Sequence, residues 1–131
     1  MAWWDENPCR FLDEVERMDK FTNAQLRVVD GDKLPGAFDS GMYLAWIETI
    51  TSSSDCKYMV IVICGKDHPN SAPAVWILDP DIGRQHHVNA DGSLSLREYD
   101  IPPDKAYVLN IRNLALEWIE YYETKNRHEF T

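Results

Sequence analysis

The residues best suited to chemistry lie in the run QHHVNADGSLS at positions 85–95. Two histidines, His86 and His87, precede a predicted turn at Asp91-Gly92, because glycine accepts a positive φ and aspartate hydrogen-bonds to its own backbone. Imidazoles donate, accept or transfer protons near neutral pH. The last hydroxyl, that of Ser95, can serve as a nucleophile where a base activates it. This mixture indicates a catalytic segment, provided that the rest of the chain builds a scaffold for it.

The composition is typical of a single globular domain spanning residues 1–131, long enough to bury a core. The formal net charge of −9 disfavours binding to phosphate backbones, so we expect no nucleic-acid partner. No apolar run is long enough to span a bilayer, and residues 1–6 lack the basic and apolar segments of a signal peptide. We therefore expect a cytoplasmic protein with no membrane partner.

The three cysteines, Cys9, Cys56 and Cys64, share no CxxC spacing, so neither a disulfide framework nor a zinc site is indicated. Cys64 ends an apolar run and is predicted to be a buried small hydrophobe. A metal site made of His68 and the two histidines at 86–87 lacks a convincing ligand spacing. We expect neither a metal nor a cofactor.

The hydrophobic pattern predicts helix, four strands, a long irregular segment and a second helix. A first amphipathic helix begins at Asn7-Pro8, with Asn7 as its N-cap and the proline at the first helical position. A second helix places apolar residues, Trp118 among them, at helical spacing over 111–122, with Glu117 on its polar face. The strands are expected at Gln25–Asp30, Met42–Ile50, Lys57–Cys64 and Ala74–Leu78. Short turns between them favour an antiparallel meander, and the segregation of strands from helices indicates an α+β fold with helices on one face of the sheet. The irregular segment at 79–105 is long enough to indicate a functional loop.

The order of elements and two motifs resemble the ubiquitin-conjugating enzymes over residues 7–123. That family shares an N-terminal helix, a four-stranded antiparallel meander, an extended active-site segment and C-terminal helices. The run DHPNSAPAV at 67–75 is similar to the family's tyrosine-proline, x-x-x, proline signature between the third and fourth strands. Pro69 and Pro73 stand at its prolines, while His68 replaces the tyrosine and an alanine replaces one proline. The resemblance implies the UBC-like version of the α+β fold.

The run VNADGSLS at 88–95 matches, without a gap, the second half of the family's catalytic segment, which ends in asparagine-glycine, a small residue, an aliphatic residue and the catalytic cysteine. His87 stands in the place of a motif asparagine, and Ser95 in that of the cysteine. By resemblance, His87 donates to the oxyanion of the intermediate or acts as a base toward the incoming amine; alternatively, it only fixes the loop backbone. Asp100 either orients or deprotonates an acceptor lysine or is a solvated loop carboxylate.

Bacterial relatives of the family resemble the chain further, because a His-x-Asn-x-Asp-Gly-Ser-Leu-Cys segment is common among them. Such proteins work in antiphage operons of two kinds: cyclic-oligonucleotide signalling (CBASS) and bacterial ubiquitin-like conjugation. The implied function is acyl transfer, in which the C-terminal glycine of a protein modifier is accepted as a thioester and passed to an amine. The implied modifier is a nucleotidyltransferase of the cGAS-like class or a ubiquitin-like protein, and an activating enzyme is a further expected partner.

Ser95 leaves three explanations open. It is an introduced Cys-to-Ser change that traps an intermediate, a natural inactive variant that binds partners without chemistry, or a sign that the nucleophile lies elsewhere. The second explanation corresponds to an alternative function, a binding module that scaffolds a ubiquitin-like protein or a nucleotidyltransferase. By resemblance, the first helix meets the activating enzyme through exposed side chains that include Glu14, and Tyr99 and Tyr107 wall the groove for the modifier's tail.

Overall fold

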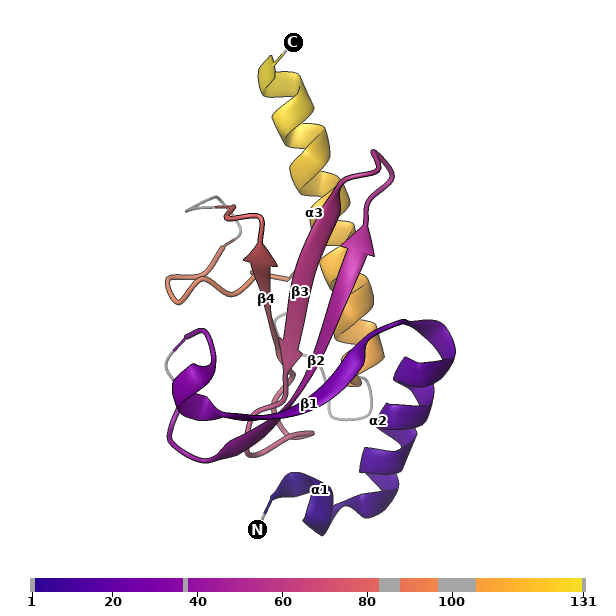
Figure 1. Ribbon diagram of the computed structural model, residues 1–131, viewed down its shortest axis with the longest axis vertical. Helices are drawn as coiled ribbons and strands as arrows, with labels where there is room; N and C mark the ends of the chain where they lie inside the picture. Colours follow the sequence, from indigo (N-terminus) through magenta and orange to yellow (C-terminus); the bar gives the residue numbers. More distant parts are fainter. Residues whose placement is uncertain (1, 37, 83–87, 97–105, 131) are drawn as a thin grey trace.

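The computed structural model describes residues 2–36, 38–82, 88–96 and 106–130, and it describes side chains as far as Lys125. The chain is α+β, as the sequence predicts (Figure 1). Its elements are α1 (Trp3–Glu6), α2 (Pro8–Phe21), β1 (Gln25–Asp30), the 3-10 helix η1 (Gly31–Lys33), β2 (Met42–Thr51), β3 (Lys57–Ile63), β4 (Ala74–Asp79) and α3 (Val108–Phe130).

The four strands form one antiparallel sheet in the order β1-β2-β3-β4, which confirms the predicted meander. In the register, Trp46 of β2 lies opposite Leu26 of β1 and Val62 of β3. The bounds of β1 are those predicted. The other three strands begin where predicted, and each ends one residue away from its predicted last residue. Pro69 and Pro73 lie in the connection between β3 and β4, where the sequence motif places them.

The helices cover one face of the sheet (Figure 1). The main core lies between this face and the helices. Alternate residues of a strand point to opposite faces, so a single set of strand side chains meets the helices. The fully buried members of this core include Met18, Leu44, Trp46, Val60, Val62, Val75, Ile111, Ala115 and Ile119. The predicted apolar face of the second helix is therefore confirmed.

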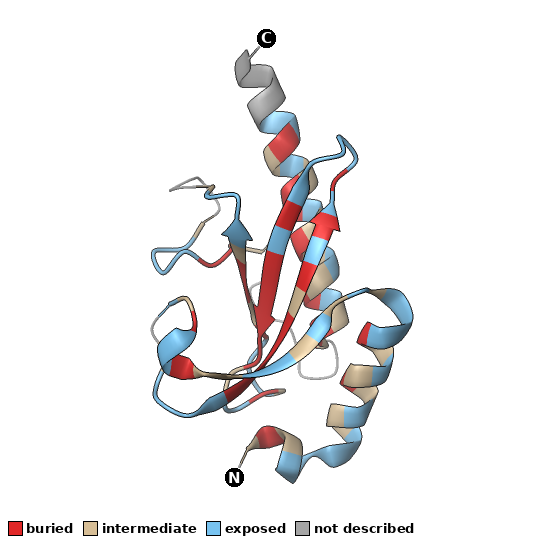
Figure 2. Cartoon of the chain, viewed as in Figure 1, coloured by how far each residue is buried: buried red, intermediate tan, exposed pale blue. Residues whose placement is uncertain are grey.

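A smaller core covers part of the opposite face. Leu34 and Phe38, from the connection after η1, pack there against Tyr43 and Trp76. As a result, residues 43–46 of β2 and residues 60–63 of β3 are buried on both faces. Towards the β2–β3 connection, buried and exposed residues alternate in both strands (Figure 2).

Two features of the N-terminal region differ from the sequence-based prediction. A one-turn helix, α1, precedes α2 and buries Trp3 to 2% exposure, beside Phe11 of α2. Glu14 of α2 was expected on the exposed face, and this is wrong, since its side chain is fully buried. An amphipathic pattern cannot identify a carboxylate that is paired inside the core. None of the helices in the described ranges combines the length and apolarity needed to cross a membrane.

Candidate functional site

The predicted Asp91-Gly92 turn is present and closes a small hairpin. Val88 and Leu94 form an isolated antiparallel bridge, and the Asn89 N–H donates to the Ser93 carbonyl at 2.8 Å. Gly92 has φ +92°, a region that glycine enters without the cost paid by other residues. The turn therefore follows from its sequence.

A carboxylate holds the turn from within. The backbone N–H and the hydroxyl of Ser93 both donate to Asp91 Oδ1, at 3.0 and 2.6 Å. The side-chain hydrogen bond from Ser93 is the main reason that the pKa of Asp91 is lowered. Asn89 Nδ2 donates in turn to the Ser93 hydroxyl at 3.0 Å. The hydroxyl of Ser93 and the amide of Asn89 are thus explained by loop structure alone.

The hairpin is fixed to β4 at two points. The Leu94 N–H donates to the Val75 carbonyl at 2.8 Å, and the Trp76 indole N–H donates to the Asp91 carbonyl at 3.2 Å. Leu94 is itself buried in the main core. The backbone that leads into Ser95 is therefore anchored immediately before that residue.

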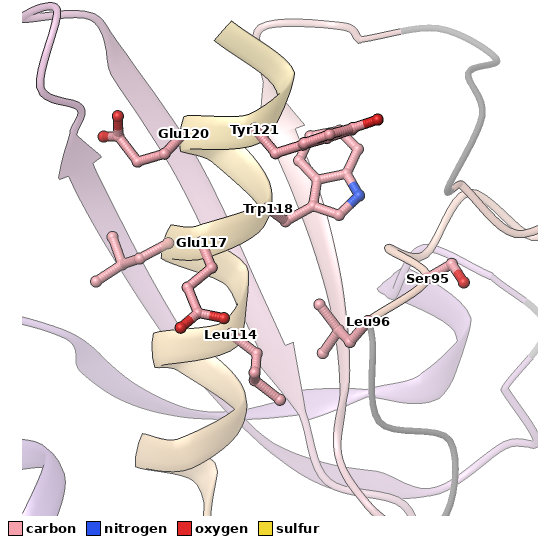
Figure 3. A pocket seen from close by; sticks show the side chains of 8 residues that line it. Ser95, Leu96, Leu114, Glu117, Trp118, Glu120 and Tyr121 are labelled. Atoms are coloured by element: carbon pink, nitrogen blue, oxygen red, sulfur yellow. The ribbon is translucent and has the colours of Figure 1, made fainter. Parts of the chain in front are cut away.

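Ser95 is half-buried and lines a cavity of about 560 Å³ between the end of this segment and α3. In Figure 3, Leu96 points toward Leu114 of α3, while the Ser95 hydroxyl lies on the side away from the helix. The described residues that line the cavity are Ser95, Leu96, Leu114, Leu116, Glu117, Trp118, Glu120 and Tyr121. The volume is in the range of ordinary ligand pockets.

The walls of the cavity are apolar with carboxylates on the helix side. Trp118 stacks on Tyr122 with their ring planes 12° apart, which fixes the indole against α3. Glu120 is engaged by the β2–β3 connection, where the backbone N–H of Ser53 donates to it at 2.8 Å. Glu117 is exposed and has no partner among the residues that the structure describes. Among the described residues that line the cavity, Glu117 therefore carries the carboxylate without a partner.

The chemistry open to Ser95 depends on its neighbours. Within ranges 2–36, 38–82, 88–96 and 106–125, its hydroxyl has no hydrogen-bond partner, and a serine hydroxyl needs an adjacent base to act as a nucleophile. The position itself is half-buried and anchored, and a more acidic group such as a thiol would not need such a base there.

Several residues singled out by the sequence lie outside the described residues. These are His86, His87, Tyr99 and Asp100. Their predicted roles at the site stay predictions.

Tyr107 is not among the residues that line the cavity; it packs on α2 instead. The guanidinium groups of Arg10 and Arg17 lie 3.7 and 3.9 Å from the centre of its ring, and its hydroxyl donates to Asp13 at 2.9 Å. This bond to Tyr107 is the main cause of the lowered pKa of Asp13. Tyr107 directly precedes α3, so these contacts hold the start of α3 against α2.

His68 is part of a buried network at the start of α3. Its Nε2 lies 2.6 Å from Glu14 Oε2, and the other Glu14 oxygen accepts from the Val108 N–H at 2.9 Å. Because the first N–H groups of a helix have no partner within it, Glu14 acts as a cap supplied by another helix. This network fixes where α3, and with it one wall of the cavity, begins.

No group of three or more metal-ligating side chains occurs in the described part of the chain. Cys9 and Cys56 are exposed, whereas Cys64 is buried as predicted, and burial raises the pKa of its thiol well above the ordinary value. Cys64 is thus unsuited to act as a thiolate nucleophile.

The cavity wall on α3 is the part of the site that the sequence did not indicate. Trp118 was assigned to the apolar face and Glu117 to the polar one, and their spacing carries no sign of a hollow. No protein-family model, curated protein or solved structure matches the chain.

Proposed function

We propose that the chain is a UBC-like acyl transferase whose nucleophile position is Ser95. In this function the C-terminal glycine of a protein modifier is held as an acyl group at position 95 and passed to an amine. The modifier would be a ubiquitin-like protein or a nucleotidyltransferase of the cGAS-like class, in a bacterial antiviral operon.

One observation carries the proposal: an anchored turn presents Ser95 at the edge of a cavity, after a four-stranded meander and before a long helix. The backbone on the N-terminal side of Ser95 is tied to β4 through Leu94 and Asp91. The connection that holds Pro69 and Pro73 precedes β4, in the order that the resemblance requires. A fixed backbone is what an acyl-carrying residue needs, since geometry held in advance lowers the barrier to transfer.

The reaction has two steps. With a thiol at position 95, the thiolate attacks the activated glycyl carbonyl, a C–S bond forms and the activating group leaves. The acceptor amine then attacks the thioester, so that a C–N bond forms as the C–S bond breaks, and the amine proton is lost as the thiolate departs. With serine at this position, both steps are slower because the hydroxyl is much less acidic and its ester is less reactive.

The test uses Ser95→Cys in a chain where the exposed Cys9 and Cys56 are replaced by serine. The protein is mixed with a synthetic peptide that ends in a glycyl thioester, and the adduct is followed by intact mass. We expect acylation at position 95 at a rate about tenfold above that at an unconstrained thiol. The adduct should be released by dithiothreitol and should acylate N-acetyl-lysine amide.

Ser71→Cys in the same background is the matched control, since Ser71 is an exposed serine in the β3–β4 connection. Equal acylation of the two introduced thiols would refute the proposed nucleophile position. Cys64 is kept in both proteins because its burial makes it unreactive.

The alternative function is a binding module that uses the same fold without chemistry. It is favoured by one observation, namely that the Ser95 hydroxyl lacks a base among the described residues. The gene separates the two: a cysteine codon at position 95 supports an introduced change in an enzyme, and a serine codon supports the binding module. Neighbouring genes separate the operons, because a nucleotidyltransferase gene indicates CBASS, whereas genes for an activating enzyme and a ubiquitin-like protein indicate the other system.

A further inference from the structure

The indole of Trp76 joins two segments that are far apart in the sequence. Its ring belongs to the smaller core, where it is 5% exposed, and its centre lies 5.6 Å from that of the Phe38 ring. Its N–H donates to the Asp91 carbonyl at 3.2 Å, in the hairpin that leads to Ser95. One side chain therefore contacts both the connection after η1 and the hairpin.

The connection after η1 packs tightly against this indole. Gly36 has φ +81°, and a Cβ added there would lie 2.8 Å from Cζ2 of Trp76. Because that distance is well inside van der Waals contact, a side chain at position 36 would displace the indole or its own backbone. On the hairpin side, a Cβ at Gly92 would lie an ordinary 3.6 Å from the same ring. The connection thus fixes the indole, and the indole holds the hairpin.

The hydrogen bond from Trp76 is one of two that attach the hairpin to β4. The other runs from the Leu94 N–H to the carbonyl of Val75, the residue before Trp76. A single attachment leaves a segment able to turn about it, whereas attachments to two neighbouring residues of a strand also fix its direction. Since Ser95 follows Leu94 directly, the direction of the hairpin decides where position 95 is presented.

We propose that Trp76 is a positioning residue for position 95, and that the connection after η1 sets the place of its indole. Trp76 acts through the Asp91 carbonyl and is assigned no contact with the reacting atoms. The smaller core lies on the sheet face away from the helices, so packing on that face governs a site beside α3. The proposal rests on the proposed function for the role of Ser95, whereas the anchoring can be measured without chemistry there.

The first test measures how firmly the hairpin is held, by amide hydrogen exchange followed with NMR. Trp76 is replaced by 3-benzothienylalanine, which keeps the shape of the ring and has sulfur in place of the N–H. Exchange at the Asn89 and Gly92 amides, which donate within the hairpin, should quicken about three- to tenfold, the range of one neutral hydrogen bond. Trp76→Phe should act in the same direction. Unchanged exchange at both amides would overturn the proposal.

The same replacement at Trp3 is the matched control. This indole is 2% exposed, and its N–H has no hydrogen-bond partner among the described residues. Exchange in the hairpin should therefore stay at the rate of the parent chain. Equal quickening by the replacements at Trp3 and Trp76 would indicate a general loss of stability and would count against the assigned role.

The second test asks whether the connection after η1 acts through the indole. Gly36→Ala should quicken exchange at Gly92, because the added methyl group displaces Trp76. A phenyl ring has no atom in the place of Cζ2, so Gly36→Ala should have no further effect on the hairpin once Trp76→Phe is present. Additive effects of the two changes would refute the assigned coupling.

The third test uses the Ser95→Cys protein with Cys9 and Cys56 replaced by serine. Benzothienylalanine at position 76 should slow acylation by the glycyl thioester peptide about three- to tenfold. Alkylation by iodoacetamide, which needs only an exposed thiolate, should not slow. Equal slowing of both reactions would indicate a less exposed or less acidic thiol and would refute the positioning role. If Ser95→Cys is not acylated with Trp76 intact, the proposed function fails, and the exchange experiments alone then decide whether Trp76 fixes the hairpin.

Discussion

His68 Nε2 lies 2.6 Å from Glu14 Oε2, and neither side chain is exposed to solvent. The pair joins α2 to the β3–β4 connection. The other oxygen of Glu14 caps α3 through the Val108 N–H, so three parts of the chain meet at one carboxylate. Arg10 Nε lies 3.5 Å from the same carboxylate. Because α3 forms a wall of the cavity, the stability of this network bears on the site.

Removing the carboxylate should be costly. Glu14→Ala leaves an imidazole and a helix N–H buried without their acceptor, and we expect the free energy of unfolding to fall by about 3–5 kcal/mol. Urea denaturation followed by tryptophan fluorescence measures the loss. Glu16→Ala on the same helix is exposed and should change stability by no more than about 0.5 kcal/mol.

His68→Phe combined with Glu14→Ala completes a double-mutant cycle. The double variant should lose less than the sum of the two single variants, since neither partner is then left alone in the core. Additive losses would show that the two side chains do not interact as the geometry indicates.

Gly92→Ala tests the turn that leads to Ser95. A Cβ at this glycine would lie 3.6 Å from the Trp76 ring, an ordinary contact, so the cost is that of the positive φ of +92°. We expect a loss of about 1–2 kcal/mol in the free energy of unfolding. Gly65→Ala is the control, since its φ lies outside the left-handed region and its nearest new contact is 3.4 Å. Equal losses in the two variants would argue against strain at Gly92.

Much of this architecture could be predicted from the sequence because it depends on local chemistry. The positions of the strands, the proline at the start of α2 and the Asp91-Gly92 turn each depend on neighbouring residues, and each is present as predicted. The side-chain cap expected from Asn7 is not formed, although the helix begins there. Short-range rules therefore gave the elements and their order.

Long-range pairing could not be predicted in the same way. Glu14 and His68 are 54 positions apart, and nothing in either local pattern indicates that they meet in the core. The cavity likewise depends on how α3 lies against the segment that ends in Ser95 and Leu96. Tertiary packing decides such contacts. His87 and Asp100, for which the sequence predicts roles at the site, lie outside the described residues.

The ion pair between Glu48 and Arg112 provides a further prediction. Arg112 Nε and Nη2 donate to the two oxygens of Glu48, each at 2.8 Å, and join β2 to α3. Arg112→Lys keeps the charge but loses the paired geometry, and should cost about 1.5–3 kcal/mol in the free energy of unfolding. Lys125→Arg, a conservative change at an exposed position on the same helix, should be neutral in the same urea assay. If Arg112→Lys leaves the free energy of unfolding unchanged, charge alone holds β2 and α3 together.

Glu123 should make stability depend on pH in the acid range. Burial acts to raise the pKa of this carboxyl, but the hydrogen bonds it accepts, led by those from Ser54, Ser52 and Tyr58, outweigh burial and hold the pKa below the ordinary 4.5. The folded state therefore binds this proton less readily than the unfolded state does. The contribution of Glu123 to the free energy of unfolding is complete above pH 4.5 and is lost as pH falls through the lowered pKa.

Glu123→Gln should therefore reduce the fall in the free energy of unfolding between about pH 5 and pH 2, measured by urea denaturation at each pH. Glu117→Gln, at an exposed position six residues earlier on α3, should keep the pH profile of the parent chain. Because the hydroxyls of Ser52 and Ser54 come from the β2–β3 connection, Ser52→Ala with Ser54→Ala should bring the pKa of Glu123 back toward its ordinary value. If both glutamine variants retain the parent's acid profile, that profile arises from other carboxylates and the assigned role of Glu123 is wrong.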